Sequence, residues 1–102
     1  MAFINKTAVL TDTLATVYTV PALKEAVVHA VYFTPLVAST EVTIKAGVSG
    51  STGHIGKDVP LVAGGTLFFP KPVNLAAGEI LEAKATVSSD AELFLSILEK
   101  DA

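Results

Sequence analysis

The residues best suited to chemistry in this chain gather between Gly47 and Lys57, where the sequence reads GVSGSTGHIGK. A phosphate-binding loop needs a glycine, four further residues and then Gly-Lys-Ser/Thr. Here Ser51 stands where the first glycine belongs, and Asp58 stands where the magnesium-binding hydroxyl belongs. Because the segment departs from the motif at two positions, we expect a flexible connection between strands.

The two histidines, His29 and His54, are the next candidates for a site. Asp58 follows His54 by four residues, but a third metal ligand is missing close by in the sequence,. His29 lies in an apolar segment, so we expect it at the edge of the core or in an interface. We therefore predict no metal site within one chain. A metal ion on an oligomer axis, bound by one histidine from each subunit, remains an open alternative.

Hydrolytic chemistry needs a nucleophile, a base and an orienting acid. The sequence has no Gly-x-Ser-x-Gly elbow, and Ser49 and Ser51 flank a glycine in the expected loop,. We expect the carboxylates of Glu79 and Glu82 at strand ends facing water, where charge protects sheet edges. The chain is thus predicted to be no enzyme, with no catalytic residues and no cofactor.

Composition excludes several classes of function. The 102 residues suffice for one domain,. With no cysteine, disulfides and thiolate metal sites are impossible. The net charge is −3 and arginine is absent, which argues against nucleic acid as a partner,. The longest uncharged apolar stretch, residues 26–40, is short and holds Pro35, so we also expect no membrane partner,.

Alternation of apolar and polar residues indicates β-strands. The clearest case is Thr40–Val48, where Val42, Ile44 and Ala46 alternate with polar residues,. Residues 80–87 alternate in the same way, and residues 13–20 have the Thr, Val and Tyr content of a strand,. Gly64-Gly65 predicts a tight turn that joins residues 59–63 to residues 66–69 as a hairpin.

Two apolar segments fit either a helix or a strand. Residues 22–33 follow Pro21, a residue favoured at the first helical position,. Residues 89–100 have capping-box spacing between Ser89 and Glu92,. The valines and aromatic residues of residues 26–33 favour a strand. We therefore favour strands for both, with one face in the core and the other in an interface.

These strands predict an all-β, single-domain antiparallel fold, a β-sandwich or a small barrel, that comprises residues 8–102. Residues 1–7 are expected to form an N-terminal arm, since unpaired termini are usually mobile. Half of the chain is hydrophobic (51%), which is more apolar surface than one small core hides. We therefore expect copies of the chain, or a partner, to cover the remainder.

The order of the motifs resembles that of small virion structural proteins of tailed bacteriophages. Each motif alone is ordinary strand-turn-strand sequence, and the match extends over residues 13–99. Leu23 departs from this pattern, since the family usually has Gly or a polar residue near this turn. The matching segments, in order, are TVYTVPA (residues 16–22), the apolar segment 26–33, the alternating segment 42–48, DVPLVAGGTL (residues 58–67), LAAGEILEA (residues 75–83) and the apolar segment 94–99.

This resemblance implies a jelly-roll-like sandwich that works on a virion as an oligomer, in particular a capsid decoration (cement) protein and homotrimer. Its partners would be copies of itself and the major capsid protein or other virion proteins. Its location would be the capsid surface, after synthesis in the host cytoplasm. We expect Phe3, Ile4, Phe33 and Phe94 to make the contacts.

Two alternatives stay open at this point. The first is a tail, neck or fibre component, which is again a structural protein. The second is a carbohydrate-binding or adhesin module, in which residues 49–57 and aromatic side chains form the site.

Overall fold

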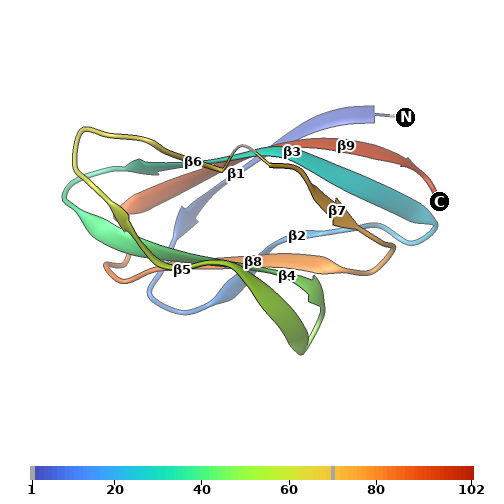
Figure 1. Ribbon diagram of the computed structural model, residues 1–102, viewed down its shortest axis with the longest axis horizontal. Helices are drawn as coiled ribbons and strands as arrows, with labels where there is room; N and C mark the ends of the chain where they lie inside the picture. The colour runs from blue at the N-terminus through green and yellow to red at the C-terminus, as the bar shows by residue number, and fades with distance from the viewer. Residues whose placement is uncertain (1, 70) are drawn as a thin grey trace.

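Two antiparallel β-sheets packed face to face make up the fold (Figure 1). The computed structural model describes residues 2–69 and 71–102, and within them the chain forms nine strands and no helix. The predicted all-β sandwich is therefore confirmed. The strands are β1 (Ala2–Leu10), β2 (Ala15–Thr19), β3 (Lys24–Pro35), β4 (Thr40–Val48), β5 (Ser51–Leu61), β6 (Leu67–Phe69), β7 (Val73–Leu75), β8 (Ile80–Ala85) and β9 (Ala91–Asp101).

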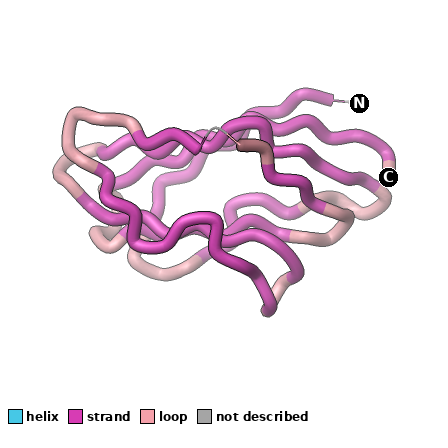
Figure 2. The backbone as a smooth tube through the Cα atoms, viewed as in Figure 1, coloured by secondary structure: helices cyan, strands magenta, loops and turns pink. Residues whose placement is uncertain are grey.

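The order of strands in the sheets is that of a jelly roll. One sheet has the order β1-β9-β3-β6, with β7 also paired to β3, and the other has the order β2-β8-β4-β5. If β6 and β7 are counted as one interrupted strand, each sheet has four strands, as in an eight-stranded jelly roll. We call the first sheet the β9 sheet and the second the β8 sheet. Figure 2 shows them as the upper and lower layers.

Both ambiguous segments are strands. Residues 24–35 form β3 and residues 91–101 form β9, and these two strands pair along nearly their whole length. Every second side chain of β9 from Ala91 to Ile97 is fully buried, which is the period of a strand and not of a helix,. In β3 the alternation is shifted by a β-bulge at His29, so that Val28 and Val31 both point into the core,.

The core lies between the two sheets and consists mainly of aliphatic side chains. Phe33 is the largest of the side chains that are completely buried, and its ring meets Phe69 edge to face at 5.8 Å. The buried aliphatic residues with no exposed surface are Val28, Val42, Ile44, Leu81, Ala85, Ala91, Leu93 and Ile97.

Two expectations about the glycine-rich segments are wrong. Gly64-Gly65 does form a turn, in which the Gly65 N–H donates to Val62 O at 2.9 Å. The turn makes no hairpin, because β5 belongs to the β8 sheet and β6 to the β9 sheet. Most of residues 47–57 is no loop either, since it forms the end of β4 and the first half of β5 around the two-residue turn Ser49-Gly50.

The expected N-terminal arm can be placed except for Met1, which lies outside the described residues. Residues 2–7 form the first part of β1 and pair with β9 in continuous register, from Ala2 opposite Glu99 to Leu10 opposite Ala91. Because this pairing includes every residue from Ala2 onward, these residues are a strand of the sandwich. β1 is the outermost strand of the β9 sheet.

The turn before β3 carries local strain. Leu23 has a φ of 64° and its side chain is 83% exposed, while the Lys24 N–H donates to Pro21 O at 3.2 Å. A left-handed backbone brings Cβ close to the following carbonyl oxygen and costs about 1–2 kcal/mol for a residue other than glycine. At this position the backbone conformation favours glycine, so Leu23 is less suited to the turn than the Gly or polar residue that we expected.

Replacing this residue should stabilise the protein. We expect Leu23→Gly to raise the free energy of unfolding by about 0.5–1 kcal/mol, because the relieved strain exceeds the entropy that glycine adds to the unfolded chain. Leu23→Ala is the control, since alanine has the same Cβ and should give little gain. Urea denaturation of the three proteins measures the effect, and equal gains from Gly and Ala would contradict the strain argument.

A buried carboxylate, that of Asp90, links the connection before β9 to the connection between β3 and β4. Asp90 is 3% exposed, and its Oδ1 accepts from the Val37 N–H at 2.7 Å and from the Ala38 N–H at 2.9 Å. Its own backbone oxygen accepts from the Leu36 N–H at 2.8 Å. Asp90 therefore holds the connection between β3 and β4 in place.

Removing this carboxylate should destabilise the fold. We expect Asp90→Ala to lower the free energy of unfolding by about 2–3 kcal/mol, because two backbone N–H groups lose their acceptor. Asp90→Asn keeps an acceptor oxygen and should lose clearly less. Chemical denaturation compares the two variants, and an equal loss in both would show that these hydrogen bonds are not the cause.

Candidate assembly interface

The residues that could have formed a catalytic or metal site lie apart from one another. His54 lies in β5 opposite Lys45, whereas Asp58 bonds to Thr43, whose hydroxyl accepts from the Asp58 N–H at 3.1 Å. Among residues 2–69 and 71–102, no group of three or more His, Asp or Glu side chains is placed to hold a metal ion.

Both carboxylates of the expected acidic pair have partners inside the fold. Glu79 Oε1 accepts from the Ala76 N–H at 2.6 Å and closes the turn before β8. Glu82 Oε1 accepts from the Thr52 hydroxyl at 2.7 Å and joins β8 to β5. Each carboxylate therefore stabilises local structure.

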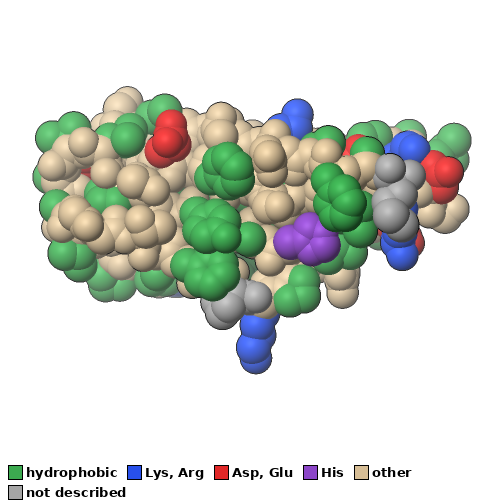
Figure 3. All heavy atoms as spheres, turned by 90° about the horizontal axis from the view of Figure 1, so that it is seen from above, with side chains coloured by type: hydrophobic (Ala, Val, Ile, Leu, Met, Phe, Trp, Pro, Cys, Tyr) green, Lys and Arg blue, Asp and Glu red, His purple; other side chains and the backbone are tan. Residues whose placement is uncertain are grey.

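Three aromatic rings lie side by side on the outer face of the β9 sheet. Tyr32 of β3 stacks on Phe68 of β6, with centroids 4.9 Å apart, and meets Phe94 of β9 edge to face at 6.2 Å. We call these three residues the aromatic row. Between 36% and 47% of each is exposed. Figure 3 views this face and shows adjoining hydrophobic rings across its middle.

The register of the strands places the three rings of the aromatic row on the same face of the sheet. Tyr32 is opposite Phe94 on one side and opposite Phe68 on the other, so all three point the same way. Their neighbours in sequence, such as Phe33 and Leu93, point into the core. The alternation that builds the core thus also sets the aromatic rings on the outside.

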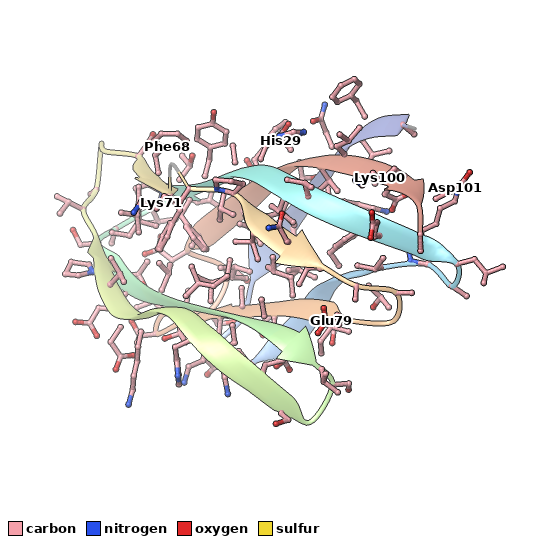
Figure 4. The ribbon with its side chains drawn as sticks, turned by 45° about the vertical axis from the view of Figure 1, so that its right-hand side comes forward. His29, Phe68, Lys71, Glu79, Lys100 and Asp101 are labelled. Atoms are coloured by element: carbon pink, nitrogen blue, oxygen red, sulfur yellow. The ribbon has the colours of Figure 1, made fainter. Side chains whose placement is uncertain are left out.

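A second aromatic contact lies farther along the same face. The ring of Phe3, 77% exposed, stacks on His29 at 6.1 Å. The histidine projects from the bulge in β3, and Figure 4 shows it on the same side of the molecule as Phe68. Between this contact and the aromatic row lie the small side chains of Ala30 and Ser96.

The acids and lysines within the strands of this face lie toward its two ends, and the exposed Lys71 lies in the connection between β6 and β7. At the end near the C-terminus, Lys24 bonds to Asp101 at 2.6 Å and Lys100 to Glu25 at 3.1 Å. The hydrogen bond and the charge of Asp101 raise the pKa of Lys24, and the same contact lowers the pKa of the Asp101 carboxyl. At the other end lies Glu92.

The outer face of the β8 sheet is different in character. Register places Lys45 beside Glu82 and Lys84 beside Thr43, with their buried neighbours Val42 and Ile44 turned inward. This face is therefore alternately charged and polar, as a water-facing sheet should be. The sandwich has one solvated face and one neutral aromatic face.

The structure separates the four predicted contact residues. Phe3 and Phe94 are exposed on the neutral face, and Ile4 is half-buried in β1. Phe33 is completely buried against Phe69, so its ring offers nothing to a partner, and Tyr32 takes its place on the surface. Sequence reasoning missed Tyr32 and Phe68. The hydroxyl of Tyr32, beside the purely apolar Phe33, was the available signal for which of the two faces outward.

Beside β1, the open edge between the two sheets forms a cleft of about 400 Å³, lined by Ile4, Lys6, Tyr18 and Glu99 among others. The Tyr18 hydroxyl donates to Glu99 Oε2 at 2.5 Å. Burial first, and then this carboxylate, raise the pKa of the Tyr18 phenol.

In the described part of the chain, no helix is long and apolar enough to cross a membrane.

Paired substitutions should separate the core from the surface. We expect Phe33→Ala to lower the free energy of unfolding by about 3–5 kcal/mol, because it leaves a cavity between the sheets. Phe94→Ala removes a ring that is already partly in water and should cost about 1 kcal/mol or less. Thermal denaturation at low protein concentration measures both, and similar losses would contradict the assignment of these two faces.

Comparison with known proteins gives a likeness of fold. No protein-family model matches the chain, and no curated protein matches it. Among solved structures, it is similar to a protein of the Bacillus endospore appendages, a family of disulfide-linked pili, with a TM-score of 0.60 and 15% identity over 98% of this chain and 85% of that one.

A chain of infectious bursal disease virus strain Gx also matches, with a TM-score of 0.49 and 13% identity over 94% of this chain. The match covers 33% of the viral chain. At 15% identity, the likeness to the Bacillus protein concerns the fold alone.

Proposed function

We propose that this protein is a non-enzymatic structural subunit that self-associates through the neutral face of the β9 sheet. The aromatic row, formed by Tyr32, Phe68 and Phe94, is the observation that carries this proposal. Aromatic residues are enriched in the cores of protein interfaces, and charged residues are depleted there. This face has both properties.

The distribution of charge makes the outer face of the β9 sheet the surface at which a second copy of the chain is least opposed. The chain carries a net charge of −3, so two copies repel one another at long range,. Contact through the β9 sheet brings together surfaces whose described strands carry no acid or lysine at their centres, with Glu25, Glu92 and Lys100 toward the ends. Burying uncharged aromatic surface needs no desolvation of ions, so self-association is least opposed there.

The likeness to pilus proteins supports self-assembly, but the copies of this chain would be held together by other contacts than disulfides. The similar Bacillus proteins form disulfide-linked pili. This chain has no cysteine, so its copies have to hold together by non-covalent contacts. An apolar face of aromatic rings supplies such contacts, at about 25 cal/mol for each Å² of apolar surface buried.

We propose more specifically that the assembly is the decoration of a phage capsid. The ordered motifs of residues 13–99 and the jelly-roll sandwich are what support this role. A small rigid protein that binds only the assembled shell stabilises that shell by mass action. Closed rotational symmetry, which recurs in homo-oligomers, would let such an assembly match a symmetry axis of the capsid lattice.

Self-association through this face predicts the behaviour of one variant. Phe68→Ser should raise the dissociation constant of the oligomer about tenfold or more, because a central aromatic anchor is lost. The domain itself should lose only about 1 kcal/mol from the missing stack with Tyr32. Native mass spectrometry over a range of concentrations measures the association.

Val48→Ser is the matched control, because Val48 is an exposed apolar side chain at the far end of β4, in the β8 sheet. It should leave the mass distribution unchanged. A wild-type protein that stays monomeric at high concentration would sink the proposal. The decoration role is tested by immunogold labelling of intact particles: labelling spread over the shell supports it, and labelling confined to the tail overturns it.

A further inference from the structure

β1 is an edge strand with little of the usual protection of an edge, since Lys6 is its one protective residue,. It runs for nine residues and pairs with β9 in continuous register with no bulge. Its other edge has no partner strand in the described part of the chain, since β1 stands at the end of the sheet. Such an edge presents a row of backbone N–H and C=O groups that a further strand can bind.

The other edges of the sandwich are protected. β2 has five residues and a register shift between Thr16 and Tyr18. β5 is long, but its pairing with β4 shifts twice, and it contains two glycines and Pro60. β6 and β7 have three residues each and are separated by the sequence Pro-Lys-Pro. Short, bulged or proline-containing edges of this kind disfavour further pairing.

The composition of β1 suits a strand that is paired on both sides. Its sequence, AFINKTAVL, contains no proline or glycine, and its single charged residue is Lys6. From these observations we propose that β1 pairs antiparallel with β1 of a second copy, which joins two β9 sheets into one continuous sheet. The inference deepens the proposed function, because it rests on the self-association of the chain.

Lys6 limits the register of this pairing. In an antiparallel pair about a two-fold axis, one residue of β1 faces itself. An axis at Lys6 would set two ammonium groups opposite one another, which is destabilising. An axis at Asn5 instead places Lys6 opposite Ile4 of the second copy, and Phe3 opposite Thr7.

The outer face favours the axis at Asn5. Phe3, with 77% of its surface exposed, would lie beside Thr7 of the second copy. Thr7 is itself opposite Phe94, the first ring of the aromatic row. The rings of one copy and Phe3 of the other would then form a continuous aromatic surface across the joint. Phe3 would be covered by a neighbour instead of by water.

On the side of β1 that faces the second sheet, Glu99 offers a charge opposite to that of Lys6 of the second copy. Lys6 of the second copy, opposite Ile4, would point toward the cleft between β1 and β2. That cleft is lined by the carboxylate of Glu99, which lies on β9 opposite Ala2. Glu99 holds the Tyr18 hydroxyl through Oε2. A cation from each copy would therefore approach an acid of the other, which complements the pairing of the backbones.

A chain without cysteine allows a direct test by disulfide trapping. Asn5→Cys should form a covalent dimer under mild oxidation, because Cβ atoms of directly opposed residues lie about 4.5–5.5 Å apart. Thr7→Cys is the matched control on the same strand and face. In the proposed register its thiols are four residues apart along the strands, about 13 Å, too far for a disulfide.

A mixture of two variants tests the register independently. Phe3→Cys mixed with Thr7→Cys should give a heterodimer on oxidation, visible as one mass in mass spectrometry. Each variant alone should stay largely unlinked. Dimer from Thr7→Cys alone, with none from Asn5→Cys, would overturn the proposed register.

Two further outcomes separate this inference from the proposed function. If the wild type is oligomeric by native mass but neither Asn5→Cys nor the mixture cross-links, the pairing of β1 is wrong while self-association stands. If Asn5→Cys cross-links equally well in a Phe68→Ser background, the edge contact is confirmed as independent of the aromatic row. A monomeric wild type without any cross-link would defeat both.

Discussion

The pairing of β3 with β9 is the interaction on which the rest of the structure depends. These two strands form the centre of the β9 sheet, and their register decides at once which side chains fill the core and which reach the surface. With Tyr32 opposite Phe94, Phe33 and Leu93 are turned inward and completely buried. A shift by one residue would reverse every one of these positions. The burial of the core therefore fixes the aromatic surface as firmly as it fixes the fold.

The two faces of the sandwich obey different constraints. The outer face of the β8 sheet alternates acids, lysines and threonines, and some of these also bond within the sheet, as Thr52 does to Glu82. The ion pairs of the β9 sheet in the described residues lie where β3 and β9 reach the end of the sheet. A monomer gains nothing from exposing Tyr32 and Phe68 to water. Their exposure has a physical reason once a second protein surface covers them.

The strands with regular alternation could be predicted from the sequence, whereas the pairing of one strand with another could not. Val42, Ile44 and Ala46 mark β4 by local pattern alone, and the valines of β3 favour a strand over a helix. Pairing between β3 and β9 is set by packing between segments far apart in the chain, which no local pattern records. For that reason Phe33 was expected on the surface and Tyr32 was missed. The bulge at His29 added a further shift that alternation could not show. Gly64-Gly65 likewise indicates a turn without indicating that the chain crosses between sheets there.

The aromatic row and the free edge of β1 belong to one sheet, and this links the two proposed modes of contact. The row runs across β9, β3 and β6, and Thr7 of β1 continues it to the edge. Association by faces alone would leave the nine-residue edge of β1 open to any strand, which favours uncontrolled aggregation. Pairing of that edge with its own copy satisfies the backbone groups and closes the joint, because a two-fold contact uses the same surface on both subunits. Two-fold pairing of the proposed kind closes after two copies, so any larger assembly would have to grow through the apolar face.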